Sequence, residues 1–227
     1  MIPLMTDPAG DPAGDPAGSS LHIQAKPSSQ WMQFVQACAA CRRCSLAETR
    51  KQVVVWRGAE QAPLMFIGEG PGAEEDERGM PFVGAAGRLL DLLLTAHGLE
   101  PDHFHICNIV KCRPPQNRVP TPEEAKACKP WLAQQFRLVH PKIIVLLGAT
   151  AVKYFTGNQE GITKIRGQWI EKNGFLILPV FHPAYILRNN NERGKLWDDI
   201  GMVRQKMEEM DLIAPLSCQP DMPQGRR

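Results

Sequence analysis

Short, continuous apolar runs alternate along the chain with longer segments in which apolar residues recur at helical spacing. The clearest runs are residues 63–68 (PLMFIG), 105–110 (HICNIV) and 142–148 (KIIVLLG), each with turn-forming or helix-breaking residues nearby. Runs of this length and content are typical of strands that are buried on both faces. The pattern therefore predicts three core strands of one sheet.

A helical pattern follows each of these runs. Residues 85–97 carry leucines at helical spacing, residues 121–136 begin with a Thr-Pro-Glu start signature, and residues 149–155 follow the third run. Strands that alternate with helices imply a parallel sheet with helices on both faces. We expect an α/β protein, a three-layer α/β/α sandwich with a central, mainly parallel sheet.

Two further elements are expected towards the C-terminus. Residues 162–171 and 175–183 flank the turn pair Asn173-Gly174, so they are predicted to form a hairpin that adds one more strand to the sheet. A last helix is expected over residues 194–210.

The two ends of the chain differ from its middle. Residues 1–29 hold three tandem DPAG copies and a Ser/Pro-rich stretch, and residues 213–227 contain three prolines and end in Gly-Arg-Arg. Such segments carry too little apolar surface to fold. We therefore expect a disordered leader, a single domain over residues 30–212, and a disordered tail.

Composition excludes a membrane protein and leaves a nucleic-acid partner open. The chain has 227 residues, 43% of them hydrophobic, which is enough for one good core. Its apolar runs are too short to span a membrane and its N-terminus lacks the pattern of a signal peptide, so we expect a cytoplasmic protein. The formal net charge of +2 neither requires nor excludes a polyanionic partner.

The cysteines point to a metal centre. Seven of them are an odd number in a chain without an export signal, which favours metal ligation over disulfides. Cys41-x-x-Cys44, with Cys112 and Cys128, supplies four thiolates, enough for a tetrahedral zinc ion or an iron–sulfur cluster. Cys38-x-x-Cys41 is an equally good pair, and spacing alone does not decide between the two pairs.

Glycine-rich and polar segments follow the predicted strands. Residues 68–76 follow the first strand, residues 108–118 the second, and residues 181–185 the last. Ligands of such sheets bind at the carboxyl ends of the strands, so one site is expected there. A dinucleotide is not expected, because Pro71 removes an amide donor and acidic residues 74–77 lie where a phosphate would sit.

Four motifs, in order, resemble the family-4 uracil-DNA glycosylases, the iron–sulfur branch of their superfamily. The motifs are GEGPGAEEDERGMPFVGAAGRLLD, ICNIVKCRPPQNRVPTPEEAKAC, ITKIRG and FHPAYILRN, and the resemblance covers residues 31–210. It implies a base excision repair enzyme that hydrolyses the N-glycosidic bond of deoxyuridine in DNA, releases uracil and leaves an abasic site. It also implies a 4Fe-4S cluster held by Cys41, Cys44, Cys112 and Cys128.

The resemblance further implies a narrow pocket for a uracil flipped out of the DNA stack. Gly68 and Gly70 would allow close approach of the base and sugar, and Phe82 would stack on the ring, worth about 1 to 3 kcal/mol. Asn108 would read the uracil edge with its amide, donating to O4 and accepting from N3-H. Glu75 would lie beside C5, where thymine carries a methyl group, and exclude that base sterically.

Catalysis would rest on stabilising the charge that develops as the glycosidic bond breaks. By the same resemblance, His182 would donate to uracil O2. Asn117 and Glu69 would orient the attacking water, because Gly70 stands where some superfamily members carry a carboxylate. The motifs contain no lysine placed to form a Schiff base, so the enzyme is expected to be monofunctional.

Basic residues beside the motifs are expected to contact DNA phosphates, with binding that weakens at high salt. Ile186, Leu187 and Arg188 are expected to enter the gap left by the flipped base. The basic residues expected to contact phosphates are Arg42, Arg43, Arg50, Lys51, Arg57, Lys111, Arg113, Arg118, Lys164, Arg166, Arg188 and Arg193. We expect a monomer that is associated with the nucleoid, acts on uracil-containing DNA and precedes the downstream base excision repair proteins.

Two other classes of function were weighed against this one. A related enzyme acts on another deaminated base, or forms a covalent adduct with DNA through a histidine after the second motif, but residues 113–124 (RPPQNRVPTPEE) contain no histidine. A non-enzymatic iron–sulfur binding module would leave Phe82, Asn108 and His182 without a role.

Overall fold

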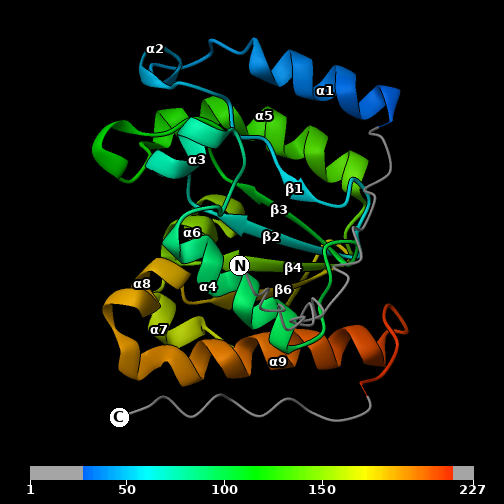
Figure 1. Cartoon of the computed structure of the whole chain (residues 1–227). Coiled ribbons are helices and arrows are strands. Elements are labelled where there is room, and N and C mark those ends of the chain that lie inside the picture. Colours follow the sequence, from blue (N-terminus) through cyan, green and yellow to red (C-terminus); the bar gives the residue numbers. More distant parts are fainter. Residues whose placement is uncertain (1–27, 217–227) are drawn as a thin grey trace, which may run out of the picture.

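The computed structural model describes residues 28–216. Figure 1 shows a sheet between two layers of helices, which confirms the expected three-layer α/β/α sandwich. The strands are β1 (Arg57–Gly58), β2 (Leu64–Gly68), β3 (Phe104–Asn108), β4 (Ile143–Leu147), β5 (Ile170–Lys172) and β6 (Phe175–Val180). The α-helices are α1 (Ser29–Ala39), α2 (Leu46–Thr49), α3 (Ala73–Arg78), α4 (Ala85–Ala96), α5 (Pro122–Val139), α6 (Ala149–Thr156), α7 (Ile162–Ile165), α8 (Pro183–Arg188) and α9 (Arg193–Glu209). Two 3₁₀ turns, η1 (Pro115–Asn117) and η2 (Asn190–Glu192), complete the described elements.

The sheet is mainly parallel, as predicted. Its strand order is β1-β3-β2-β4-β6-β5, in which β3, β2, β4 and β6 are parallel and the two edge strands are antiparallel to their neighbours. The carboxyl ends of the four parallel strands therefore lie at one edge of the sheet.

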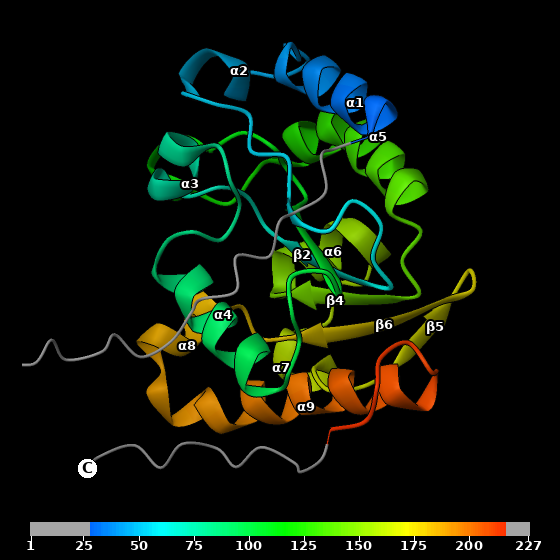
Figure 2. The ribbon, with the colours of Figure 1, turned by 45° about the vertical axis from the view of Figure 1, so that its right-hand side comes forward.

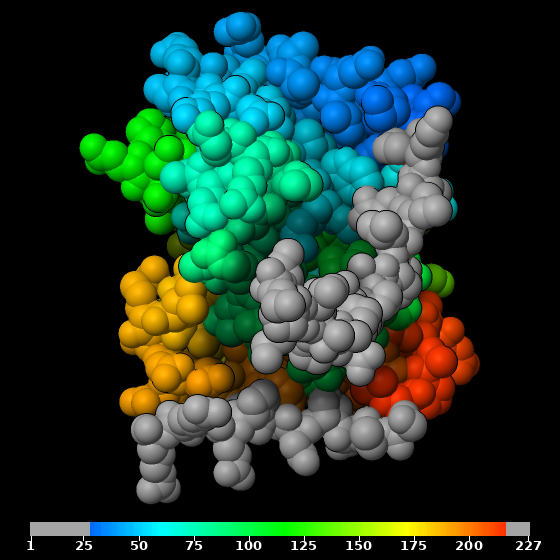
Figure 3. All heavy atoms as spheres, viewed as in Figure 1, coloured from blue at the N-terminus to red at the C-terminus, as the bar shows by residue number. Residues whose placement is uncertain are grey.

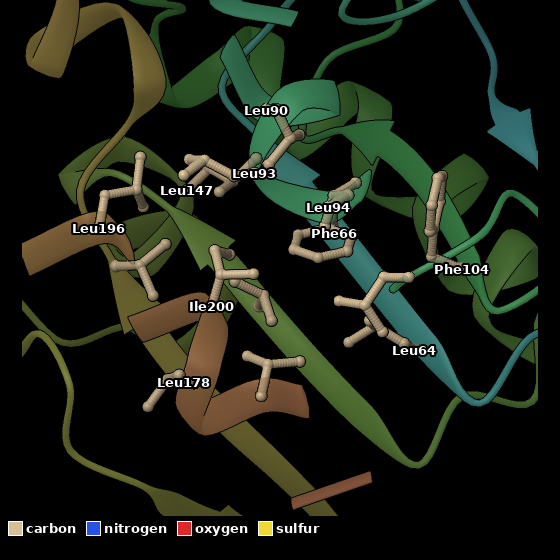
Figure 4. Close-up of a cluster of buried hydrophobic side chains, with 14 of the residues drawn as sticks. Leu64, Phe66, Leu90, Leu93, Leu94, Phe104, Leu147, Leu178, Leu196 and Ile200 are labelled. Carbon is tan, nitrogen blue, oxygen red and sulfur yellow. The ribbon is translucent and has the colours of Figure 1, made fainter. Parts of the chain in front are cut away.

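Alternation along the strands divides the core between the two faces of the sheet. In β2, Leu64 and Phe66 belong to one apolar cluster, whereas Met65 and Ile67 belong to another. The first cluster is completed by leucines of α4 and by Leu196 and Ile200 of α9 (Figure 4). The second is completed by apolar residues of α5 and α6, so each face of the sheet is covered by its own set of helices. Each fully buried Leu or Phe contributes about 1.5 to 3 kcal/mol.

Helix α1 forms an additional layer on top of α5. Its buried Trp31 and Phe34 pack with Val55 and with Val139 at the end of α5, and both ribbon views show α1 beside that helix (Figures 1 and 2). The N-cap of α1 is Ser28, whose side chain accepts from the Trp31 amide. Helix α1 thus starts next to residue 30, the expected start of the domain. The other residues of the expected leader, and residues 217–227 of the expected tail, lie outside the described residues.

The predicted hairpin is confirmed in its turn and wrong in its first half. Asn173 and Gly174 both have positive φ, 52° and 80°, and join β5 to β6. Residues 162–165, however, form the helix α7 rather than a strand. Ile162 and Ile165 are three residues apart, so one helical turn places both against the core. Gly167, with φ of +71°, then redirects the chain into the short β5.

The start of α5 is formed as its sequence predicts. The Thr121 side chain accepts from the Glu124 amide at 3.2 Å, and the Glu124 carboxylate accepts from the Thr121 amide at 2.8 Å. No helix in the range 28–216 is long and apolar enough to cross a membrane.

Candidate active site and thiol cavity

A cleft of about 510 Å³ opens at the edge where the parallel strands end. Its walls come from all four strand ends and from α3, α8 and η1, so segments far apart in the sequence meet there. In the space-filling view, α3, the segment around η1 (bright green) and α8 (orange) gather at the same end of the molecule (Figure 3). The predicted site residues that line the cleft are Glu69, Gly70, Glu75, Phe82, Asn108, Asn117, His182 and Arg188.

Asn108 lines this cleft and carries a buried side-chain acceptor without a partner. It is the last residue of β3, where it pairs with Gly68 of β2, and its side chain is only 1% exposed. Among the described residues, nothing donates a hydrogen bond to its Oδ1. Buried polar atoms are nearly always hydrogen-bonded, so an unpaired Oδ1 on a cleft wall indicates a ligand that donates a hydrogen bond there.

Phe82 is held in the cleft by two close glycines. Its φ is +55°, a left-handed conformation that is uncommon for a bulky residue, and its side chain is buried. A Cβ on Gly68 would lie 2.5 Å from Asn108 Oδ1 and 2.6 Å from Phe82 Cζ. A Cβ on Gly87 would lie 1.7 Å from the Phe82 carbonyl oxygen. Only glycine fits at either position, and the backbone strain at Phe82 is maintained by this packing.

Glu75 fixes the loop that carries Phe82. One carboxylate oxygen accepts from the amides of Val83 and Gly84 at 3.0 and 2.8 Å, and the other accepts from the Gly72 amide at 3.0 Å. These bonds join the start of α3 to the start of α4. Sequence reasoning treated Glu75 only as a steric barrier, and the structure shows in addition that it shapes the loop.

His182 is the N-cap of α8 and faces the cleft as a neutral imidazole. Its Nδ1 accepts from the Ala184 amide at 3.1 Å, so the neutral ring carries its proton on Nε2. Burial, with a smaller contribution from the Arg188 guanidinium, lowers the pKa of His182 to about 4. At neutral pH the Nε2-H group is thus available as a donor without a positive charge on the ring.

Asn117 and Glu69 lie on the cleft wall that Gly70 leaves open. Asn117 has φ of +56°, and its Oδ1 accepts from Arg113 Nε at 2.8 Å. A Cβ on Gly70 would lie 2.8 Å from Val110 Cγ2, so a carboxylate side chain does not fit there. Asn117 and Glu69 are thus polar side chains that line the cleft beside the Gly70 backbone.

The predicted DNA-contacting residues divide into two groups. Arg188 lines the cleft, and Leu187 and Lys164 are exposed, with Leu187 at 52%. Several of the other guanidinium groups have partners within the protein. Arg113 holds Asn117, Arg118 donates to both oxygens of Glu124 at 2.8 and 2.7 Å, and Arg166 pairs with the buried Asp199.

Five cysteines surround a second, smaller cavity beside α5. Cys38, Cys41, Cys44, Cys112 and Cys128 all line it. Three of these sulfurs accept N–H donors. Trp131 Nε1 donates to Cys41 at 3.1 Å, an Arg50 guanidinium nitrogen to Cys112 at 3.3 Å, and the Lys111 amide to Cys128 at 3.3 Å.

The thiols of this cavity are strongly desolvated. Burial raises the pKa of Cys38 to about 12 and that of Cys128 to about 11, and it also raises the pKa of Cys112. Across residues 28–216, no three His, Cys, Asp or Glu side chains are arranged to hold a metal ion. The five cysteine sulfurs line a common space, and such an all-sulfur donor set is the kind that binds a thiolate-held metal group.

Sequence reasoning missed the contributions of β4 and of the fourth motif's aromatic residue. Gly148 and Thr150, just after β4, line the cleft, as do Val119 and Tyr185. The position of Gly148 at the end of a predicted parallel strand was a usable signal. Tyr185, inside FHPAY, had no individual signal, because its distance from the cleft depends on where α8 packs.

Comparison with known proteins gives a consistent result. Residues 55–201 match the model of the uracil DNA glycosylase superfamily. The chain is 48% identical to the type-4 uracil-DNA glycosylase of Thermotoga maritima over 66% of this chain and 80% of that protein. It is 42% identical to the type-4 uracil-DNA glycosylase of Sulfurisphaera tokodaii over 73% of this chain and 80% of that protein. Similarity to the type-5 uracil-DNA glycosylase of Thermus thermophilus is lower, 31% identity over 53% of this chain and 69% of that protein.

Proposed function

The chain belongs to the uracil DNA glycosylase superfamily, and from this premise we propose that its cleft binds a uracil flipped out of DNA and releases it by hydrolysis. The reaction breaks the N-glycosidic bond of deoxyuridine and leaves an abasic site for base excision repair. The observation that carries the assignment of the site is the buried, unpaired Oδ1 of Asn108 on the wall of the cleft.

Asn108 is the reader of the base. Uracil N3-H supplies the donor that Oδ1 lacks, and the Asn108 NH₂ group donates to uracil O4. Cytosine has an acceptor at N3 and an amino donor at C4. Its N3 would face the Asn108 oxygen and its amino group the Asn108 NH₂, so neither hydrogen bond would form. Phe82 stacks on the ring, and Glu75 shapes the loop beside C5.

His182 stabilises the leaving group. Negative charge develops on uracil as the bond breaks, and the Nε2-H of a neutral imidazole donates to O2 where that charge accumulates. Asn117 and Glu69 orient the attacking water against the sugar. The cleft lining within the described residues includes no lysine, which supports a monofunctional hydrolysis rather than a Schiff-base mechanism.

A 4Fe-4S cluster would be held by Cys41, Cys44, Cys112 and Cys128. Three of these sulfurs, those of Cys41, Cys112 and Cys128, accept N–H donors, as thiolate ligands commonly do. Among the described residues no such donor reaches Cys44 or Cys38, so the choice of Cys44 follows the family resemblance. When bound, the cluster would supply a rigid cross-link between the segment before β2 and the loop after β3. That cross-link would hold Asn117 and its neighbours in place.

Residues around the cleft are proposed to contact DNA. Arg188 and Lys164 are proposed to contact phosphates, and the exposed Leu187 to enter the gap left by the base. We further propose that the protein acts as a monomer in the cytoplasm, on nucleoid DNA, ahead of the enzymes that process abasic sites.

The activity is tested by incubating the protein with oligonucleotides that contain a single uracil, thymine or cytosine. We expect alkali-labile sites only at uracil, and no strand break without alkali. Strand breaks without alkali, or an adduct trapped by borohydride, would contradict the monofunctional mechanism.

The cofactor is tested separately. Pure protein should be brown and contain iron and sulfide, and a colourless protein with stoichiometric zinc would reject the cluster. Cys112→Ser should lose iron and thermal stability, whereas Cys38→Ala should keep its iron. Loss of iron from Cys38→Ala but not from Cys44→Ala would reassign the ligand pair.

A further inference from the structure

Lys111 is one of the largest fully buried side chains of the protein, at 1% exposure, although lysine is rarely buried. It follows Asn108 by three residues and lies between the cleft and the cavity lined by the cysteines, to whose lining it contributes. Its ammonium group forms no ion pair with a carboxylate within the described part of the chain. A buried ammonium group is costly unless an opposite charge lies nearby.

Three groups of Lys111 connect three parts of the structure. Its Nζ donates to the main-chain oxygen of Asn108 at 2.8 Å. Its amide donates to Cys128 Sγ at 3.3 Å, and its carbonyl oxygen accepts from the Val54 amide at 2.7 Å. One residue thereby joins the base-reading strand end, a cysteine on α5 and the segment that follows the Cys-x-x-Cys pair.

The thiol cavity can provide the missing charge. A 4Fe-4S core held by four thiolates is a net anion, and Lys111 is the lysine in the lining of that cavity. The carbonyl group of Asn108, to which Lys111 Nζ donates, belongs to the stretch of main chain that orients the Asn108 side chain. This stretch is also tied to the first motif, since Ile109 donates to the Gly68 carbonyl at 2.9 Å and Val110 to that of Glu69 at 3.3 Å.

We propose that Lys111 is a positioning residue that links the occupant of the thiol cavity to recognition of the base. Its buried ammonium balances the negative charge of the thiolate-bound cluster, and the same group fixes the main chain of Asn108. The inference rests on the proposed function and deepens it, because it makes uracil recognition depend on the cluster without any redox step.

The test compares the cluster-loaded wild type with Lys111→Met, which keeps the length of the side chain and removes its charge and donor. Lys129→Met is the matched control, since Lys129 is an exposed lysine beside Cys128. The first measurement is the midpoint potential of the cluster. Removal of a nearby positive charge destabilises the reduced state, so the potential of Lys111→Met should become more negative, and that of the control should not change.

The second measurement is hydrogen exchange in the peptide that spans residues 104–112. The proposal expects faster exchange at the amides of Ile109 and Val110 in Lys111→Met, with the rest of the sheet unchanged. The third is single-turnover uracil release, which should fall about tenfold or more while affinity for DNA stays within about twofold, since one charge-assisted hydrogen bond is lost. Unchanged potential, exchange and rate in a loaded Lys111→Met protein would overturn the proposal.

A second variant decides the outcome if Lys111→Met does not retain its cluster. Lys111→Arg keeps the charge and displaces the donor, so it should keep iron and a near wild-type potential but show the faster exchange. Loss of iron from both variants would overturn the proposal, because the position would then be a general packing requirement. If the wild type itself releases no uracil, the proposed function fails, while the potential and the exchange still test the link through Lys111.

Discussion

The imidazole ring of His182 lies stacked against the ring of Phe82, with centroids 5.7 Å apart and planes inclined by 29°. Phe82 comes from the loop before α4 and His182 is the N-cap of α8, so the contact joins the first and last motifs. An apolar neighbour on one face and the Ala184 amide on Nδ1 both favour the uncharged ring. This pair forms part of the cleft wall and keeps the proposed donor, His182, uncharged.

His182 should be neutral throughout the working pH range. Its pKa is lowered to about 4, below the usual 6.5, so the ring gains a proton only when the pH falls through about 4. Uracil release should therefore show no loss near pH 6.5 from this group. Nitrogen NMR of the histidine-labelled protein should show that His182 is a single tautomer, protonated on Nε2, at pH 6. A His182 titration midpoint near 6.5 would contradict this account.

Asn108→Ala should cut single-turnover uracil release by orders of magnitude and leave DNA binding nearly unchanged. The variant removes both hydrogen bonds to the base edge, whereas the proposed phosphate contacts lie elsewhere. Asn108→Asp, which only accepts when ionised, should lose the bond to O4 and gain a trace of activity on cytosine. Near wild-type uracil release by Asn108→Ala would show that another residue reads the base.

Arg188→Ala should affect DNA binding, whereas Arg166→Ala should affect the stability of the fold. Arg188 lines the cleft, so its loss should weaken DNA binding and reduce the salt slope by about 1. Arg166 pairs with Asp199, which is 0% exposed, so its loss should leave the salt slope unchanged and cost about 3 to 5 kcal/mol of stability. Binding isotherms at several salt concentrations, with urea unfolding of each variant, check both expectations.

Glu124→Gln should lower stability by about 1 to 3 kcal/mol and slow uracil release. The Glu124 carboxylate is 5% exposed, and it accepts from Arg118, from the Thr121 amide and, at 3.4 Å, from the Ser45 hydroxyl beside Cys44. Loss of its charge should loosen Arg118 and, with it, the adjacent Asn117. Glu123→Gln, on the same turn but exposed, is the control, and equal effects of the two substitutions would argue against this clamp.

His105 should make stability depend on pH in acid. Its ring contacts the Ala59 carbonyl oxygen and Gln135 Nε2, both at 2.7 Å, and burial lowers its pKa to about 3. Between pH 6.5 and about 3 the unfolded chain binds a proton that the folded protein does not. As the pH is lowered through this window, the free energy of unfolding should therefore decrease by roughly 1.4 kcal/mol per pH unit. Above pH 6.5 this group should have no effect on stability. His105→Gln should be less stable at pH 7, but its free energy of unfolding, measured by urea unfolding at several pH values, should depend less steeply on pH.

The sequence by itself determined the sheet, its parallel core and most of the cleft. Apolar runs and helical periods depend on local patterns, and parallel strands necessarily bring their carboxyl ends to one edge. Glu69, Asn108 and His182 could therefore be assigned to one site before any contact was known, and the family resemblance added Phe82 to it. The motifs that resemble a known family added the roles of these residues.

Only the tertiary structure decided how the polar side chains are paired. A basic residue beside a motif has the same local pattern whether it faces a phosphate or a buried carboxylate, so the sequence could not show that Arg166 meets Asp199. For the same reason it could not show the three amides on Glu75, the unpaired oxygen of Asn108 or the burial of Lys111. Burial and hydrogen bonding arise from segments distant in the chain, and their partners exist only once the layers are packed.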